Sequence, residues 1–159
     1  MSSKKHIQAL QYFSYGIYVL TSKFEDEFCA STINWVTQTS KNPSMIAVCL
    51  KKDSNRLNIV REKKRFILHI LSKEQKEYAT YFMTPTIEDN GKLNSAEYSL
   101  NDSNLPILID PKVYMECEVE SIVDSGDHPI VHAKVVDTVV KENIIPLELR
   151  ETGWTYGDE

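Results

Sequence analysis

The stretch VYMECEVESIVDSGDHPIVHAKVVDTVV, residues 113–140, decides the fold class. Between residues 113 and 120, apolar side chains occupy every odd position, and tyrosine or glutamate occupies every even one. This alternation is typical of a β-strand with one buried face and one wet face. The sequence DSGD at residues 124–127 predicts a turn, and the β-branched run after it predicts a partner strand. Because the connection is short, strands at 112–123 and 128–140 are expected to be antiparallel neighbours.

Four more strands are expected before this hairpin. Runs rich in β-branched, aromatic and other apolar residues predict them; they cover residues 17–22, 28–37, 45–50 and 66–71. The run at 45–50 lacks alternation, which indicates a strand covered on both faces. Six or so strands with only brief helices between them favour a mainly β fold. We therefore expect a closed antiparallel β-barrel rather than a doubly wound sheet.

Short helices separate these strands. Helical spacing predicts them at residues 4–14, 55–63 and 72–82. Ser54 or Asp53 is the expected N-cap of the second, and Ser72 with Gln75 forms a capping box for the third. Residues 84–104 are polar and rich in Asn and Ser, so they predict a long surface excursion.

The composition excludes some classes of function. A length of 159 residues predicts one domain over residues 1–159. The chain has 18 basic and 23 acidic residues, for a net charge of −5, which argues against a nucleic-acid surface. A local basic cluster still suffices to bind one phosphorylated small molecule. The N-terminus lacks a signal peptide or membrane-spanning run, so we expect a cytoplasmic protein without membrane association.

The cysteines and the known sequence motifs add little chemistry. Cys29, Cys49 and Cys117 are far apart and form no metal-binding or disulfide pattern, so they are expected to be buried apolar thiols and no metal site is expected. The sequence has no GxGxxG, P-loop or HExxH motif.

Three polar segments are candidates for a site, and each has a plainer alternative. Residues 29–40, CASTINWVTQTS, place hydroxyl and amide groups within a strand, either to contact a flat polar ring or to face solvent at a sheet edge. Residues 51–56, KKDSNR, combine cations, a hydroxyl and a helix start, which suits a phosphate group. An ordinary charged loop would look the same. His128 after a tight turn suits hydrogen bonding or proton transfer, or is simply exposed.

Taken in order, these segments resemble the flavin reductase-like family of FMN-binding split barrels. The matching pieces are YGIYVLTS (15–22), ASTxNWVTQxS (30–40), Pro43 before the strand at 45–50, the strand at 66–71, GDH (126–128) and the tail PLxLRxTGWxYG (146–157). The similarity covers most of residues 9–157. Many family members have Thr where this chain has Arg56, and Asn where it has His69. The resemblance implies a closed split β-barrel.

The resemblance also implies which residues bind cofactors. The segment from Ser31 to Gln38 would contact the ring and ribityl groups of FMN, the loop from Lys51 to Arg56 would hold the phosphate, and His128 would lie near the nicotinamide or the flavin ring. The expected FMN contacts are Ser31, Thr32, Ile33, Asn34, Trp35, Thr37, Gln38, Lys51, Lys52, Ser54 and Arg56. The family forms homodimers, with the FMN sites near the interface.

Three functions follow from these expectations. The leading hypothesis is an oxidoreductase that passes electrons from NADH or NADPH through bound FMN to free flavin or another acceptor. The second is an FMN-carrying electron-transfer module that serves a redox partner protein and reacts little with NAD(P)H itself. The third is a barrel that has lost its flavin and serves as a binding or structural module.

Overall fold

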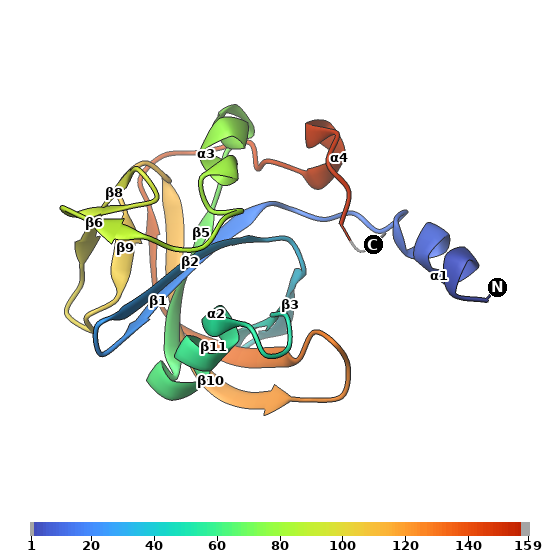
Figure 1. Ribbon diagram of the computed structural model, residues 1–159, viewed down its shortest axis with the longest axis horizontal. Coiled ribbons are helices and arrows are strands. Elements are labelled where there is room, and N and C mark those ends of the chain that lie inside the picture. Colours follow the sequence, from blue (N-terminus) through green and yellow to red (C-terminus); the bar gives the residue numbers. More distant parts are fainter. Residues whose placement is uncertain (1, 157–159) are drawn as a thin grey trace.

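The computed structural model describes residues 2–156 and contains two antiparallel sheets with short helices around them (Figure 1). The larger sheet has seven strands. In spatial order they are β2 (Glu27–Ile33), β1 (Tyr18–Phe24), β5 (Arg65–Ile70), β10 (Val113–Val123), β11 (Ile130–Val140), β4 (Ser44–Cys49) and β3 (Val36–Lys41). The hairpin expected at 112–123 and 128–140 is confirmed as the antiparallel pair of β10 and β11.

The smaller sheet and the helices lie between, before and after the strands of the larger sheet. The smaller sheet consists of β6 (Glu88–Asp89), β7 (Lys92–Leu93), β8 (Ala96–Leu100) and β9 (Pro106–Leu108). The helices are α1 (Ser2–Leu10), α2 (Asn55–Lys63), the 3-10 turn η1 (Lys73–Gln75), α3 (Lys76–Thr80) and α4 (Leu149–Thr152). The expectation of a mainly β protein with short helices is confirmed.

The expectation of a closed barrel is wrong for the described residues. The seven-stranded sheet ends in β2 on one side and β3 on the other, and these two edge strands do not pair. The cause lies in one segment: the strand predicted over residues 28–37 breaks after Ile33, and the chain resumes as β3 at Val36. As a result, β2 and β3, which are consecutive in the chain, lie at opposite edges of the sheet.

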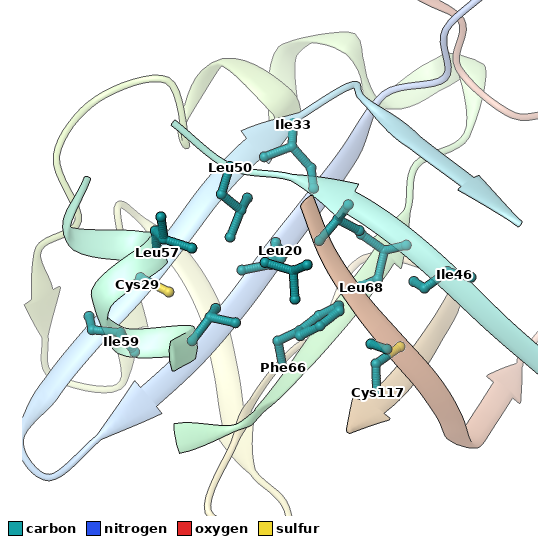
Figure 2. Close-up of a cluster of buried hydrophobic side chains, with 14 residues drawn as sticks. Leu20, Cys29, Ile33, Ile46, Leu50, Leu57, Ile59, Phe66, Leu68 and Cys117 are labelled. Carbon is teal, nitrogen blue, oxygen red and sulfur yellow. The ribbon is translucent and has the colours of Figure 1, made fainter. Parts of the chain in front are cut away.

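Helix α2 packs against the sheet. Its apolar residues Leu57, Ile59 and Val60 are buried in one cluster with side chains of β1, β2, β4 and β5 (Figure 2). The hydroxyl oxygen of Ser54 accepts a hydrogen bond from the backbone N–H of Leu57 at 3.2 Å, which confirms Ser54 as the N-cap. A capped helix with an apolar face explains why both ends of α2 were predicted correctly. The packing fixes the start of α2 beside the end of β2.

Residues 84–104 are more structured than their composition suggests. Leu93 and Ala96 are buried in the second apolar cluster, and the segment supplies three strands of the smaller sheet. Glu116, expected on the wet face of β10, is only 8% exposed. Asn101 Nδ2 and Ser103 Oγ donate to its carboxylate at 2.6 and 3.0 Å, and Arg65 pairs with it. The wet face is therefore partly covered because the excursion folds over it.

The cysteines are free thiols. Burial raises the pKa of Cys29 and that of Cys117 to about 12, so neither thiol ionises near neutral pH. The expectation of buried thiols is confirmed for these two, whereas Cys49 is half-buried.

His69 joins the two sheets from a fully buried position in β5. Its Nε2 accepts a hydrogen bond from the backbone N–H of Leu108 in β9 at 3.0 Å. A neutral imidazole has one donor and one acceptor nitrogen, so Nδ1 carries the proton. Nδ1 therefore donates to the carbonyl oxygen of Val19 in β1, 2.9 Å away.

We expect acid to destabilise the fold through His69. Burial, opposed by the bond to Val19 and helped by the charge of Lys141, lowers the pKa of His69 to about 4. Its pKa in the unfolded chain is about 6.5. Above pH 6.5 the ring is neutral in both the folded and the unfolded chain, so its contribution to the free energy of unfolding is fully present. As the pH falls from 6.5 towards 4, the unfolded chain binds a proton at His69 that the folded chain does not, and stability is lost. Between pH 7.5 and pH 5 this linkage removes about 2 kcal/mol of stability, which urea denaturation measures. A His69→Gln variant with the same pH dependence as the wild type would contradict this.

Candidate functional site

A cavity of about 950 Å³ opens beside the end of β2 and the start of α2. Its size lies at the upper end of the range of roughly 300–1,000 Å³ that is usual for small-molecule sites. Six parts of the chain line it. They are Ile17, the segment through β2 to Trp35, the segment from Cys49 to Arg56, residues 82–86, His128, and the C-terminal residues from Leu149 to Tyr156. Residues far apart in sequence thus meet at one site.

The end of β2 is fixed by hydrogen bonds to the segment at 82–86. The backbone N–H of Thr32 donates to the carbonyl oxygen of Phe82 at 3.1 Å, and Thr32 Oγ1 donates to the carbonyl oxygen of Ala79 at 2.6 Å. The Thr86 hydroxyl accepts from the N–H of Ala30 at 3.0 Å and donates to its carbonyl oxygen at 3.2 Å. Residues 82–86 therefore form a fixed wall of the cavity along β2.

The start of α2 gives the cavity lining a positive charge. Lys51 and Arg56 line it, and the first N–H groups of the nine-residue helix lie beside them. Arg56 Nη1 donates to Ser31 Oγ at 3.3 Å, but the buried Nε of Arg56 has no hydrogen-bond partner among the described residues. None of the described lining residues is Asp or Glu. Cations, a helix N-terminus and a buried unpaired donor together favour an anionic group here.

A second set of lining residues is aromatic. The rings of Trp35 and His128 are 4.5 Å apart between centroids, and the ring of Tyr156 is 5.1 Å from that of Trp35. His128 Nε2 lies 2.7 Å from the Tyr156 hydroxyl, and His128 Nδ1 lies 2.9 Å from Asp127 Oδ1. The hydrogen bond from His128, followed by the charge of that ring, lowers the pKa of the Asp127 carboxyl. These flat rings offer edges and faces to another flat ring.

Nine of the twelve residues predicted for the site line this cavity. They are Ser31, Thr32, Ile33, Asn34, Trp35, Lys51, Ser54, Arg56 and His128. Thr37, Gln38 and Lys52 do not. After the break at residues 34–35, β3 carries Thr37 and Gln38 along the sheet edge, where both are exposed. Lys52 is also exposed, and its backbone N–H donates to the carbonyl oxygen of Asp127.

Sequence reasoning gave no site role to two parts of the cavity. The wall at residues 82–86 carries no motif, and its position depends on hydrogen bonds to β2. The C-terminal part, Leu149 and Gly153 to Tyr156, belongs to the tail motif, whose last residue, Gly157, lies outside the described residues. Gly153 has a φ of 77°, a left-handed conformation that suits glycine at the end of a helix. The tail motif was thus the available signal for these residues.

His69 lies outside the cavity lining. Its hydrogen bonds to Val19 and Leu108 are part of the sheet framework. Within residues 2–156 no group of three or more His, Cys, Asp or Glu side chains is arranged to hold a metal ion. The helices in the same range are all too short or too polar to cross a bilayer.

Comparison with known protein families identifies the class. The family model described as the flavin reductase like domain matches residues 10–153, so the chain belongs to the flavin reductase-like family. This confirms the resemblance drawn from the sequence. Relatives of similar length include the NADH-dependent flavin reductase StyB of Pseudomonas fluorescens, 32% identical over 80% of this chain and 73% of StyB. The ferric-chelate reductase (NAD(P)H) of Archaeoglobus fulgidus is 29% identical over 84% of this chain and 80% of that protein.

Other relatives are longer, and solved structures share the fold. The chain spans 39% of a Rhizobium meliloti relative and 22% of a Nostoc relative. The styrene monooxygenase flavin reductase of Pseudomonas putida S12 superimposes with a TM-score of 0.73 at 27% identity, over 85% of this chain and 86% of that one. Flavin reductase PheA2 has the same fold, with a TM-score of 0.78 at 22% identity over 93% of each chain.

Proposed function

We propose that this protein is an NAD(P)H-dependent flavin oxidoreductase that holds FMN in the cavity beside α2. The observation that carries the proposal is that a cationic and an aromatic set of side chains line the same cavity. The cationic set offers the Nε of Arg56, unpaired within the described residues, and the described lining has no carboxylate, which suits a phosphate group. The aromatic set offers the rings of Trp35 and His128, which suits a flat ring system.

Each part of the cavity has a role in this proposal. Arg56 and Lys51 bind the phosphate, assisted by the N–H groups at the start of α2. Residues 31–35, the end of β2 and the turn after it, bind the ring and ribityl groups through backbone and side-chain polar atoms. His128 contacts the nicotinamide nucleotide. When bound, the flavin supplies the redox chemistry: it takes up a hydride and passes the electrons to an acceptor, free flavin or another compound.

The names of the relatives support the electron donor. StyB is named as an NADH-dependent flavin reductase, and the Archaeoglobus protein as a ferric-chelate reductase that uses NAD(P)H. We extend the donor, NADH or NADPH, to this chain. The alternative is an FMN-carrying electron-transfer module, whose bound flavin would react little with either nucleotide.

We further propose that residues 1–159 are a single domain that works as a homodimer in the cytoplasm. Two features support a partner surface: the exposed apolar side chains of Leu10, Tyr12 and Phe13, and the outer edge of β3, which no other described strand pairs with. Three free cysteines suit a reducing compartment. Sedimentation equilibrium of the purified protein measures the mass, and a monomer at micromolar concentration would contradict the dimer.

The first test is a visible spectrum of the purified protein, loaded with FMN if necessary, before and after anaerobic addition of NADH or NADPH. A yellow protein that bleaches supports the reductase, and the faster nucleotide identifies the preferred donor. A yellow protein that stays oxidised favours the electron-transfer module. A protein that does not take up FMN would contradict both.

We expect His128→Ala to slow reduction of the bound flavin by NAD(P)H by about tenfold, since a contact worth about 1.4 kcal/mol corresponds to that factor. FMN affinity should stay within about twofold, because the phosphate contacts at the start of α2 are untouched. Anaerobic stopped-flow absorbance measures the rate. The matched control is His132→Ala, a histidine of β11 that bonds to Thr39 away from the cavity. Equal rates for wild type and His128→Ala would mean that His128 has no role in reduction of the flavin by NAD(P)H.

A further inference from the structure

Three side chains, two of which line the cavity, form a hydrogen-bonded row. Asp127 Oδ1 lies 2.9 Å from His128 Nδ1, and the Tyr156 hydroxyl lies 2.7 Å from His128 Nε2. Both ring nitrogens of the imidazole are therefore occupied. The row joins the turn between β10 and β11 to the C-terminal segment after α4. Two parts of the chain therefore contact the His128 imidazole.

The chemistry of these groups fixes the direction of each hydrogen bond. An ionised carboxylate only accepts, so the neutral imidazole of His128 carries its proton on Nδ1 and donates it to Asp127. Nε2 then has a lone pair, and the Tyr156 hydroxyl must donate to it. The side chain of Asp127 is 95% exposed, whereas that of His128 is 16% exposed. Water competes for the Asp127 contact, and Tyr156, at 40% exposed, is the less exposed of the two partners.

Ring packing also acts on both partners. Tyr156 and His128 each contact Trp35, with centroids 5.1 and 4.5 Å from the indole, and the histidine and tyrosine rings are 5.8 Å apart at an interplanar angle of 87°. The indole therefore limits the rotation of both rings, and the hydroxyl sets which way the imidazole faces. A hydroxyl can also accept from a proton donor, so Tyr156 remains a partner when the ring is protonated.

We propose that Tyr156 is a positioning residue that holds His128 in one tautomer and one orientation for its contact with the nicotinamide nucleotide. This inference rests on the proposed function of the cavity. Tyr156 itself acts through His128 and is assigned no step of electron transfer. The inference also gives a role to the part of the tail motif within residues 146–156, because the turn at Gly153 returns the chain so that Tyr156 reaches the imidazole.

The first test uses flavin-free protein and involves no catalysis. Histidine side chains are labelled with ¹⁵N, and the His128 signals are assigned by their loss in His128→Ala. In the wild type we expect an unprotonated Nε2 and a protonated Nδ1. Tyr156→Phe keeps the ring beside Trp35 but removes the hydroxyl, so it should shift the Nε2 resonance and mix the two tautomers. Identical His128 signals in wild type and Tyr156→Phe would overturn the proposal.

The second test is kinetic. Tyr156→Phe should slow anaerobic flavin reduction by NAD(P)H about fivefold, the effect of losing one ordinary hydrogen bond, while FMN affinity stays within about twofold. The matched control is Tyr98→Phe, which removes a tyrosine hydroxyl bonded to Glu88 outside the cavity, and it should match the wild type in both tests. Shifted signals with an unchanged rate would overturn the positioning role. If NAD(P)H does not reduce the flavin of the wild-type protein, the proposed function fails. The ¹⁵N comparison then still decides whether Tyr156 fixes the tautomer of His128.

Discussion

Replacing His69 by alanine is expected to lower the free energy of unfolding by about 4 kcal/mol, because the change combines several costs. The N–H of Leu108 and the carbonyl oxygen of Val19 lose their partner in a fully buried place. A buried polar group without a partner costs about 1–3 kcal/mol, and the space left by the ring adds a cavity term. Urea denaturation at pH 7.5 measures the loss.

The matched control for this prediction is His132→Ala, which removes an imidazole from the exposed contact with Thr39. His132 is half-buried and its bond to Thr39 is exposed, so we expect this control to lose only about 1 kcal/mol. If His69→Ala and His132→Ala lost similar amounts of stability, the connection of the two sheets through His69 would be wrong. His69→Gln offers an amide with one donor and one acceptor group, so it should recover part of the loss.

Replacing Arg56 by alanine is expected to weaken FMN binding by roughly 1.5–3 kcal/mol, the usual value of a hydrogen bond to a charged group. Arg56 is half-buried beside Ser31, and its Nε has no protein partner among the described residues, so an anion in the cavity would be its acceptor. Fluorescence titration with FMN measures the affinity. The same titration with riboflavin, which lacks the phosphate, should show almost no effect of the substitution.

Arg61→Ala is the matched control, because Arg61 lies in the last turn of the same helix and is exposed. It should bind FMN as the wild type does. Equal affinity of the wild type for FMN and riboflavin would mean that the start of α2 is not a phosphate site. A loss of affinity for both ligands in Arg56→Ala would mean that the arginine supports the cavity through Ser31 rather than through the phosphate.

Local signals in the sequence predicted the regular elements well. The helix at 55–63 was placed correctly because a capping serine and an apolar face agree on its limits. The hairpin of β10 and β11 was placed correctly because a polar turn separates an alternating apolar and polar run from a β-branched run. Both features depend only on residues close together in the chain.

Features that depend on distant contacts were missed. The break between Ile33 and Val36 has no glycine or proline to mark it, so residues 28–37 look like one strand. Burial of Glu116 depends on Asn101, Ser103 and Arg65, which reach it from other segments. For the same reason the wall at residues 82–86 was not foreseen, since its position follows from hydrogen bonds to β2.

The described lining of the cavity has no carboxylate, whereas the chain has a net charge of −5, and this contrast has a consequence for the kinetics of ligand uptake. At long range the molecule as a whole repels a phosphorylated ligand, and attraction begins only near the entrance. Dissolved salt screens interactions beyond a Debye length of about 10 Å at 0.1 M. Moderate ionic strength should therefore speed the association of FMN while weakening its final contacts only slightly. This is the opposite of the salt dependence shown by proteins that steer anions with an overall positive field.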